Sequence, residues 1–586
     1  MASTTAGVET LPLGGEKVLA GLDHTDDVAV PSVWSIRYAA LFLCLGISLA
    51  LVLFYLIAIK PYVLLPADIL MWAETNFVGD IIKLRIGAPL YGAPEDSNST
   101  IYTPGATILT YAISWIVGLS TSIPAWRVIQ LGFVTVAAAV ATLCTRDMRK
   151  LAYGESRIDY PKTWLGVTFL AMFLVSTAPY SNRFAHALHA DALALLISII
   201  CFWTILFYLT APSWKRIILM AVCPTLGYLT KQFLIVWVGV MFLFLLLHDP
   251  RNVRRLGLFL SVSLALFFVS IGACYLLWGD AYLFWTFEVT GGSRKQIGFR
   301  ADEFNISLAR SLDHTLRAWM ELGLGVIGGW LVLRGSQVIR QLGPVWVAWL
   351  ALILMQGFLS GVGWSVLYYF GPGVLIGAVW LFAALPRFWP KPEAFEIGKL
   401  AKVAYGFRCA IAIAGVLTIF LALRVVPTGA YDRRSWHALT TSPDVYRYIA
   451  DIEREFEGFP PDKVLLDIGN WIYLRHSVLM KDRAVSLADQ PPAGIYRNID
   501  LMADRIRNRT YEKILVRNLH SPNFFYDYST WLRPSGVKQA LEENYEEVRT
   551  IPAPQAGIVV LREVTESGPI SVLVLRRIPI SSSKDP

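Results

Sequence analysis

Residues 256–278 read LGLFLSVSLALFFVSIGACYLLW and contain no charged side chain. A stretch of this length and composition can cross a hydrocarbon core roughly 30 Å thick as a single α-helix. Similar stretches recur between residues 36 and 425, and only 16% of all residues are charged, against about 25% in soluble domains. The mean hydropathy is +0.50. The sequence therefore predicts a polytopic α-helical membrane protein.

The apolar segments and the charges between them predict the number of spans. The positive-inside rule places Lys and Arg of short loops in the cytoplasm. The loops after every second segment hold sixteen Lys and Arg, whereas the alternate connections hold six. Segment 105–119 is short and follows Pro104. Only if it enters the membrane as a half-helix, without crossing, do the sixteen Lys and Arg lie on the cytoplasmic side together with the N-terminus. We therefore expect about eleven spans from these segments: 36–59, 105–119 (the half-helix), 125–144, 163–180, 190–210, 216–230, 232–248, 256–278, 316–333, 344–362, 365–385 and 404–425.

This topology divides the chain into three parts. Residues 1–35 are polar, include acids and lack a basic region before an apolar core, so they are expected to form a cytoplasmic tail. Residues 36–426 form the membrane domain, with juxtamembrane helices in two large exoplasmic loops, 60–124 and 279–315. Residues 427–586 are expected to form an exoplasmic domain.

The exoplasmic C-terminal part has its own pattern. Short apolar runs such as 464–466 and 514–516 suit strands, and stretches such as 499–509 and 537–547 suit helices. Together they predict a small soluble α/β domain.

Composition also excludes several classes of partner. The formal net charge is +8, and the loop Lys and Arg that set orientation account for it, so no nucleic acid is expected. The six cysteines lie within or at the edges of apolar segments, and no pair has metal-ligand spacing, so disulfides and zinc are not expected.

Ionisable residues near membrane depth are the best functional pointers. Asp68 follows the first span, and Glu74 lies six residues later. Two side chains at this spacing on one helix would not lie on the same face. An N-cap of an interfacial helix explains Asp68 equally well.

The next exoplasmic turn contains Arg183, His186, His189 and Asp191. His186 and His189 can share a helical face, but one such pair without a clear third ligand is weak evidence for a metal. Asp191 alone is also a suitable cap for the helix that follows it.

Lys231 interrupts an apolar run of about thirty residues where two short spans meet. A buried ammonium needs an anionic partner, which is either a carboxylate or a phosphate, unless its side chain extends to the headgroups. Arg294 and Lys295 add cations in the second large loop, where an ordinary solvated face also explains them.

The order of these features resembles the C superfamily of glycosyltransferases, specifically the branch that includes protein O-mannosyltransferases and bacterial aminoarabinose transferases. The resemblance covers roughly residues 36–385. It is carried by the acid after the first span, by Gly87–Tyr91 leading to Tyr102–Thr103–Pro104, by the second acid Asp191, by Thr230–Lys231–Gln232, and by the aromatic turn Trp364–Pro372.

Two departures limit the match. Many members have an Asp-Glu pair after the first span, but this chain has Asp68–Ile69, which leaves the second acid unassigned. The Trp-Trp-Asp-Tyr-Gly signature of oligosaccharyltransferases is absent, which excludes that branch from the sequence-based interpretation.

The resemblance implies transfer of one sugar from a polyprenyl-phosphate donor to a lipid, glycan or protein acceptor on the exoplasmic face, with inversion. Asp68 would be the base, and Asp191 would orient the reactants. Lys231, Arg294 and Lys295 would bind the donor phosphate. The expected substrate-binding residues are Glu74, Tyr91, Tyr102, Arg183, His186, His189, Tyr368 and Tyr369.

No cofactor is required by this scheme, and a divalent cation is compatible with it but not indicated. The expected location is a bacterial inner or cell membrane, with the C-terminal domain in the periplasm. The alternative is a secondary transporter or flippase for an anionic or lipid-linked substrate, but such proteins place their ionisable residues near the midplane in broken, repeated helices.

Overall fold

The computed structural model describes most of the chain. The described residues are 33–69, 72–94, 99–154, 162–178, 185–290, 309, 311–316, 318–362, 367–385, 443–466, 469–480, 497–517, 536–552 and 572–577. The expected span 404–425 lies outside these residues, as do Arg183, Arg294 and Lys295.

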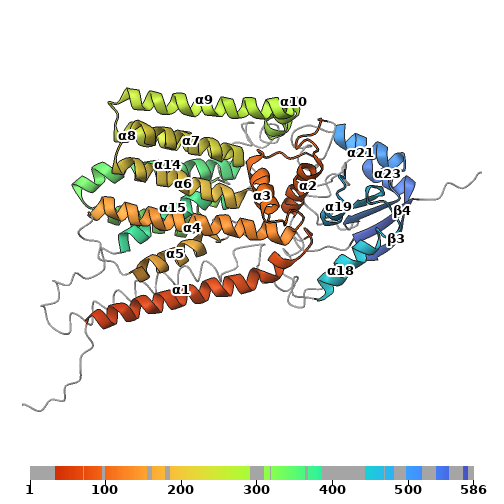
Figure 1. Ribbon diagram of the computed structural model, residues 1–586, viewed down its shortest axis with the longest axis horizontal. Coiled ribbons are helices and arrows are strands. Elements are labelled where there is room, and N and C mark those ends of the chain that lie inside the picture. The colour runs from red at the N-terminus through yellow and green to blue at the C-terminus, as the bar shows by residue number, and fades with distance from the viewer. Residues whose placement is uncertain are drawn as a thin grey trace, which may run out of the picture.

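A bundle of roughly parallel and antiparallel helices makes up the larger part of the molecule (Figure 1). Each helix falls on an apolar segment that the sequence predicts to be a span. Within the described ranges, five helices are long and apolar enough to cross a membrane, beginning at Leu41, Ile123, Asp191, Val253 and Ser336. The bundle helices are α1 (Val33–Leu64), α4 (Ile123–Tyr153), α5 (Lys162–Ser176), α6 (Asp191–Thr210), α7 (Trp214–Thr230), α8 (Val236–His248), α9 (Val253–Trp278), α13 (Trp319–Val332), α14 (Ser336–Val362) and α15 (Gly371–Ala384).

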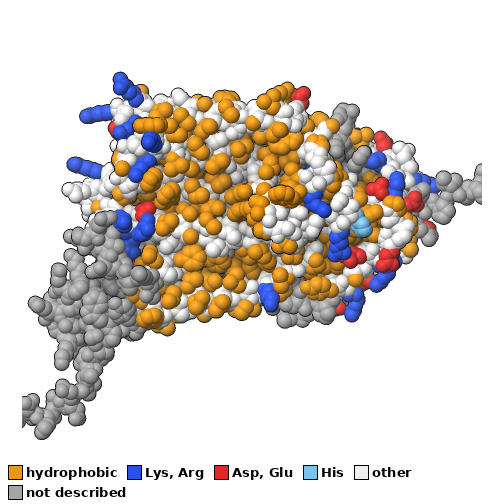
Figure 2. All heavy atoms as spheres, viewed as in Figure 1, with side chains coloured by type: hydrophobic (Ala, Val, Ile, Leu, Met, Phe, Trp, Pro, Cys, Tyr) orange, Lys and Arg blue, Asp and Glu red, His pale blue; other side chains and the backbone are white. Residues whose placement is uncertain are grey.

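The helices differ in how much of their surface the bundle covers. In α6, 83% of the most apolar 18-residue window is buried, whereas in α9 the share is 17%. Leu276 of α9 is 86% exposed, which in water would be costly. Figure 2 shows this apolar surface along the side of the bundle. The outer helices therefore fit a lipid environment, and α6 forms the centre.

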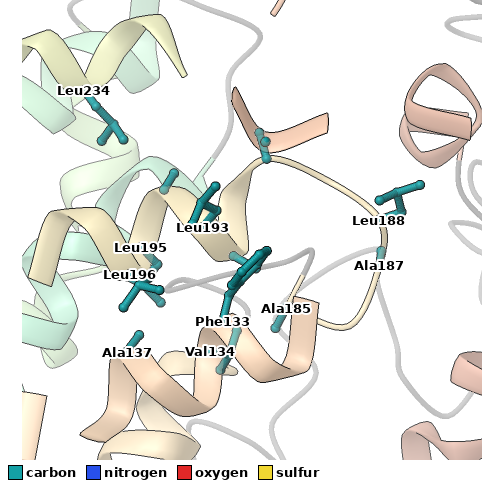
Figure 3. Packing of buried hydrophobic residues seen from close by; sticks show 14 of the residues in the cluster. Phe133, Val134, Ala137, Ala185, Ala187, Leu188, Leu193, Leu195, Leu196 and Leu234 are labelled. Carbon is teal, nitrogen blue, oxygen red and sulfur yellow. The ribbon is translucent and has the colours of Figure 1, made fainter. Parts of the chain in front are cut away.

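The interior is packed by small and large apolar side chains from neighbouring helices. Phe133 and Val134 of α4 lie against Leu196 of α6 (Figure 3). Helices α13 and α15 approach so closely that a Cβ at Gly328 would lie 2.5 Å from the Leu381 backbone. Small residues allow this close approach between helices in a membrane.

Two short helices, α2 (Trp72–Ile86) and α3 (Gly105–Ile116), lie at one end of the bundle (Figure 1). At 1.5 Å per residue, α3 is about 18 Å long, which is too short to cross the hydrocarbon core. Helices α8, α13 and α15 are only one or two residues longer, so the half-helix at 105–119 stays a prediction.

The second large loop begins with α10 (Asp280–Leu283) and a π-helical turn (Phe284–Val289). Trp285 of this turn donates from Nε1 to the Gly92 carbonyl at 2.9 Å. The two large loops therefore contact each other beside the end of α9.

The C-terminal part contains a mixed four-stranded sheet in the order β1-β2-β4-β3. Strands β1 and β2 are parallel, whereas β4 is antiparallel to both of its neighbours. The apolar runs at 464–466 and 514–516 lie in β1 and β2, as expected. The strands are β1 (Val464–Leu466), β2 (Lys513–Arg517), β3 (Tyr545–Ile551) and β4 (Val572–Arg577), and the helices are α18 (Pro443–Arg454), α19 (Trp471–His476), α21 (Arg497–Arg507) and α23 (Val537–Asn544).

One expected helix ends earlier than its sequence pattern suggests. The stretch 537–547 was predicted to be helical, but α23 ends at Asn544 and β3 begins at Tyr545. Tyr545 and Ile551 are buried at the two ends of β3, and the strand pairs with β4. Pairing with a distant strand therefore outweighs the local helical preference of the glutamates.

Candidate active site

Asp68 lies just beyond α1, where Pro66 interrupts the helical pattern, and its side chain is completely buried. Its carboxylate accepts hydrogen bonds from the C-terminal part of the chain. The Asn470 backbone N–H donates to both oxygens, at 3.0 and 2.9 Å, and the Trp471 N–H donates to Oδ1 at 3.0 Å. Asp68 thus caps the start of α19, although it is 402 residues away from Asn470 in sequence.

Burial raises the pKa of Asp68 to about 6. The hydrogen bond from the Asn470 backbone opposes this rise, and the nearby Glu74 carboxylate adds to it. A carboxylate with a pKa near neutrality is suited to accept a proton from a hydroxyl, because base strength and ionisation are balanced near the working pH.

Glu74 forms a fully buried ion pair with Arg127 at the start of α4. The guanidinium donates Nε to Oε1 at 2.8 Å and Nη2 to Oε2 at 2.5 Å, so the contact is bidentate. Such a fork is among the strongest ionic contacts in proteins. Sequence reasoning missed Arg127, although a lone cation inside a predicted span was a signal for a functional or structural site.

Arg127 also fixes the backbone that leads to Asp68. Its remaining donors reach the carbonyls of Tyr62, Leu65 and Ala67 at 2.8, 2.6 and 2.9 Å. Glu74 in turn accepts from the Leu188 N–H at 2.9 Å. The pair therefore joins the loop after α1 to the loop before α6.

The loop before α6 carries the predicted His186 and His189. His186 Nδ1 lies 3.3 Å from the Tyr55 hydroxyl, and its ring packs edge-on against Tyr62. His189 Nδ1 lies 3.0 Å from Asp191 Oδ2. The two histidines therefore point to different partners, and the expected shared helical face is not formed.

Asp191 and Lys231 form a buried ion pair between the start of α6 and the end of α7. Three aromatic rings surround the ammonium, with centroids 5.4 Å (Phe233) and 5.5 Å (Tyr102 and Tyr369) from Nζ. Cation–π attraction strengthens when the cation is removed from water, as it is here. The anionic partner that the sequence required for Lys231 is thus a protein carboxylate in this structure.

The predicted Tyr-x-Pro and Thr-Lys-Gln segments lie together. Gln232 Nε2 donates to the Ile101 carbonyl at 2.5 Å. A Cβ at Gly105 would lie 2.7 Å from the Leu229 carbonyl oxygen, so only glycine permits this approach. The start of α3 is therefore packed directly against the turn that carries Lys231.

Tyr91 lies in the loop between α2 and α3, and a second ion pair that the sequence did not reveal, Asp80–Lys83, lies within α2. The Tyr91 hydroxyl donates to the Tyr102 carbonyl at 2.6 Å. Lys83 Nζ lies 3.4 Å from Asp80 Oδ1 and 2.9 Å from the Leu90 carbonyl, and both side chains are buried. Tyr91 thus braces the segment that presents Tyr102 to Lys231.

Several predicted residues are not placed in this network. Arg183, Arg294 and Lys295 lie outside the described residues, and the Tyr368 side chain lies outside the part that is described. Within the described ranges, no group of three or more His, Cys, Asp or Glu side chains is arranged to hold a metal ion.

Comparison with known proteins gives matches in structure alone. No family model and no curated protein matches the sequence. ArnT from Cupriavidus metallidurans bound to undecaprenyl phosphate superposes with a TM-score of 0.50 and 16% identity, covering 92% of this chain and 99% of that chain. The archaeal oligosaccharyltransferase AglB from Archaeoglobus fulgidus, in complex with an inhibitory peptide and a dolichol-phosphate, gives a TM-score of 0.48 and 12% identity, covering 93% of this chain and 76% of that chain. The superposition on ArnT shows that this chain shares its fold, which agrees with the fold expected from the sequence motifs.

Proposed function

We propose that this protein is a membrane glycosyltransferase that moves one sugar from a polyprenyl-phosphate donor to an acceptor on the exoplasmic face, with inversion. The observation that carries the proposal is the buried ionic network at the end of an apolar helix bundle whose fold matches that of ArnT. Buried charges at a membrane surface are expensive and are retained for function. The lipid-linked donor is carried over from the solved ArnT complex with undecaprenyl phosphate.

Asp68 is the proposed base. The acceptor hydroxyl attacks the anomeric carbon while its proton passes to the carboxylate, and the bond between that carbon and the phosphate oxygen breaks with its electron pair leaving on the phosphate. The raised pKa of Asp68, about 6, supports this role.

Lys231 is the proposed ligand of the donor phosphate, with Arg294 and Lys295 as additional cations. A fixed ammonium stabilises the charge that develops on the leaving phosphate. In the structure the Lys231 ammonium is paired with the Asp191 carboxylate. The donor phosphate would therefore bind the ammonium beside this carboxylate or in its place. Tyr102 and Tyr369 beside Nζ are placed to contact the sugar.

The distribution of surface charge supports the proposed orientation. Exposed Lys and Arg gather at the end of the bundle opposite the C-terminal part (Figure 2). They lie at the helix ends and connections that the positive-inside rule assigns to the cytoplasm, and include Arg146, Lys150, Lys215, Arg251, Arg254, Arg334 and Arg340. The C-terminal part would then be exoplasmic.

The transporter or flippase alternative is less consistent with the geometry. A transporter binds its substrate near the bilayer midplane, commonly at breaks inside helices. Here Asp191 is the first residue of α6, and Lys231 lies in the turn between α7 and the following 3₁₀ turn Gln232–Ile235. The ionic groups are thus at helix ends, on the side where the C-terminal part docks.

Purified protein in lipid nanodiscs, incubated with undecaprenyl phosphate carrying mannose, glucose or aminoarabinose, tests the proposal. Sugar release or transfer by the wild type, with loss in Asp68→Asn and Lys231→Ala, is expected. If no donor binds, or if both variants transfer normally, the mechanism is wrong. Arg447→Ala, on an exposed face of α18, is the control and should leave transfer unchanged.

A further inference from the structure

The contact between Asp68 and the turn 469–471 is shaped for this carboxylate. A Cβ at Gly469 would lie 2.9 Å from Asp68 Oδ1 and 2.6 Å from the Trp471 ring, so any larger residue would displace the turn. The Asn470 side chain donates to the Thr75 carbonyl at 2.8 Å, which fastens the same turn to α2.

A further polar contact joins the two parts near the other end of α19. Arg85 Nη1, in the last turn of α2, donates to the Leu474 carbonyl at 3.0 Å. Helix α19 therefore lies along α2, with Asp68 at its first residues and Arg85 near its last. We call this contact, between residues 68–85 and residues 469–474, the α2–α19 seam.

The hydrogen-bonding positions around the Asp68 carboxylate are taken by groups of the protein itself. Three hydrogen bonds reach the carboxylate from backbone N–H groups of one turn, the Thr75 side chain adds another, and the residue is fully buried. A base must lie within hydrogen-bond reach of the proton it accepts. In this arrangement the turn occupies the positions that an attacking hydroxyl needs.

We infer that the α2–α19 seam is the acceptor-binding site, and that the Gly469–Asn470–Trp471 turn fills it as an internal ligand until a hydroxyl-bearing acceptor displaces it. This inference rests on the proposed function, because it takes Asp68 to be the base. The acceptor donates its O–H to Asp68 in place of the two backbone N–H groups. The C-terminal part thereby protects the donor from water when no acceptor is present.

Loosening the turn without touching Asp68 tests the inference. Asn470→Ala removes the bond to Thr75, and Arg85→Ala removes the bond to Leu474, whereas both backbone donors to Asp68 remain in place. Asn508→Ala, on an exposed face of the same C-terminal part, is the matched control.

Two readouts are measured in nanodiscs. The first is modification of Asp68 by a water-soluble carbodiimide and an amine, quantified by mass spectrometry against the exposed Asp462. The second is hydrolysis of undecaprenyl phosphate carrying mannose, glucose or aminoarabinose, in which water replaces the acceptor. Water attacks the anomeric carbon and gives its proton to Asp68, and the phosphate leaves with the electron pair of the broken bond.

Both loosening variants should raise Asp68 modification and donor hydrolysis about fivefold, the factor expected for one lost hydrogen bond. The control should match the wild type in both readouts. The inference is overturned if Asp68 modification is unchanged in both variants, or if modification rises while hydrolysis stays at the wild-type rate. Failure of the proposed function looks different, because then neither the wild type nor any variant releases sugar from any of the donors.

Discussion

Asp191 and Asp68 are both buried, but the protein balances their charges in different ways. Asp191 is paired with Lys231 and lies beside His189, within a ring of aromatic side chains from the membrane domain. Within the described part of the chain, Asp68 lacks such a cation and accepts hydrogen bonds from backbone N–H groups of the C-terminal part and from the Thr75 side chain. The Asp191 site is therefore complete within the membrane domain, whereas the Asp68 site is completed by a second part of the chain. A neutralised pair suits a fixed binding element, and an unpaired carboxylate with a raised pKa suits proton transfer.

The ion pair that joins the two sites provides the largest test of this comparison. Arg127→Met leaves Glu74 buried without a cation and three carbonyls without their donors, so we expect a loss of about 3–5 kcal/mol of stability together with all activity. Thermal unfolding in nanodiscs measures the first and sugar transfer the second. If this variant is as stable as the wild type, other contacts hold the loop after α1 against the loop before α6.

Removing the cation of the Asp191 site should lower stability by a similar amount, and a second substitution should restore it. Lys231→Met leaves Asp191 buried with His189 as its remaining partner, with an expected loss of about 3–5 kcal/mol. The double variant Lys231→Met/Asp191→Asn removes both charges, so most of the stability should return while transfer stays absent. Unfolding temperatures and donor binding are measured for the single and double variants to test whether stability returns without transfer. Recovery of transfer in the double variant would contradict a role for Lys231 in binding the phosphate.

The Asp68 site should respond in the opposite way. Asp68→Asn removes the base but keeps the volume and two polar atoms, so we expect transfer to fall by a factor of about 10²–10⁴. Its stability at neutral pH should change little, because the loss of the acceptor at Oδ2 is offset by no longer burying an ionised carboxylate. Rates and unfolding curves of the same preparation separate the two effects. A large loss of stability with modest loss of rate would make Asp68 a structural cap.

The smallest expected effect is on the pH dependence of stability. The pKa of Asp68 is about 6 in the folded protein and 3.8 as its ordinary value. Between these values the folded state keeps a proton that the unfolded state releases, so this residue makes stability rise as the pH falls from about 6 towards 4. The stability difference between wild type and Asp68→Asn should therefore favour the wild type more at pH 4.5 than at pH 7. An unchanged difference would show that burial does not raise this pKa.

Much of the site was visible in the sequence because its residues are anomalous for their surroundings. Lys231 interrupts an apolar run, and Asp68 and Asp191 lie at the ends of apolar segments on one predicted side. The same reasoning should have selected Arg127, which lies inside an expected span. It was missed because its partner Glu74 is 53 residues away and belongs to a different element.

The sequence alone determined the helices of the membrane domain, since apolar stretches of this length have few alternatives in a bilayer. It also determined which ionisable residues lie near helix ends. Only the tertiary structure decided their partners: Lys231 with Asp191, Glu74 with Arg127, and Asp68 with the turn at Asn470. The physical reason is that hydropathy is a local property of the chain. The pairing of a buried charge depends on side-chain positions that distant segments reach only after packing.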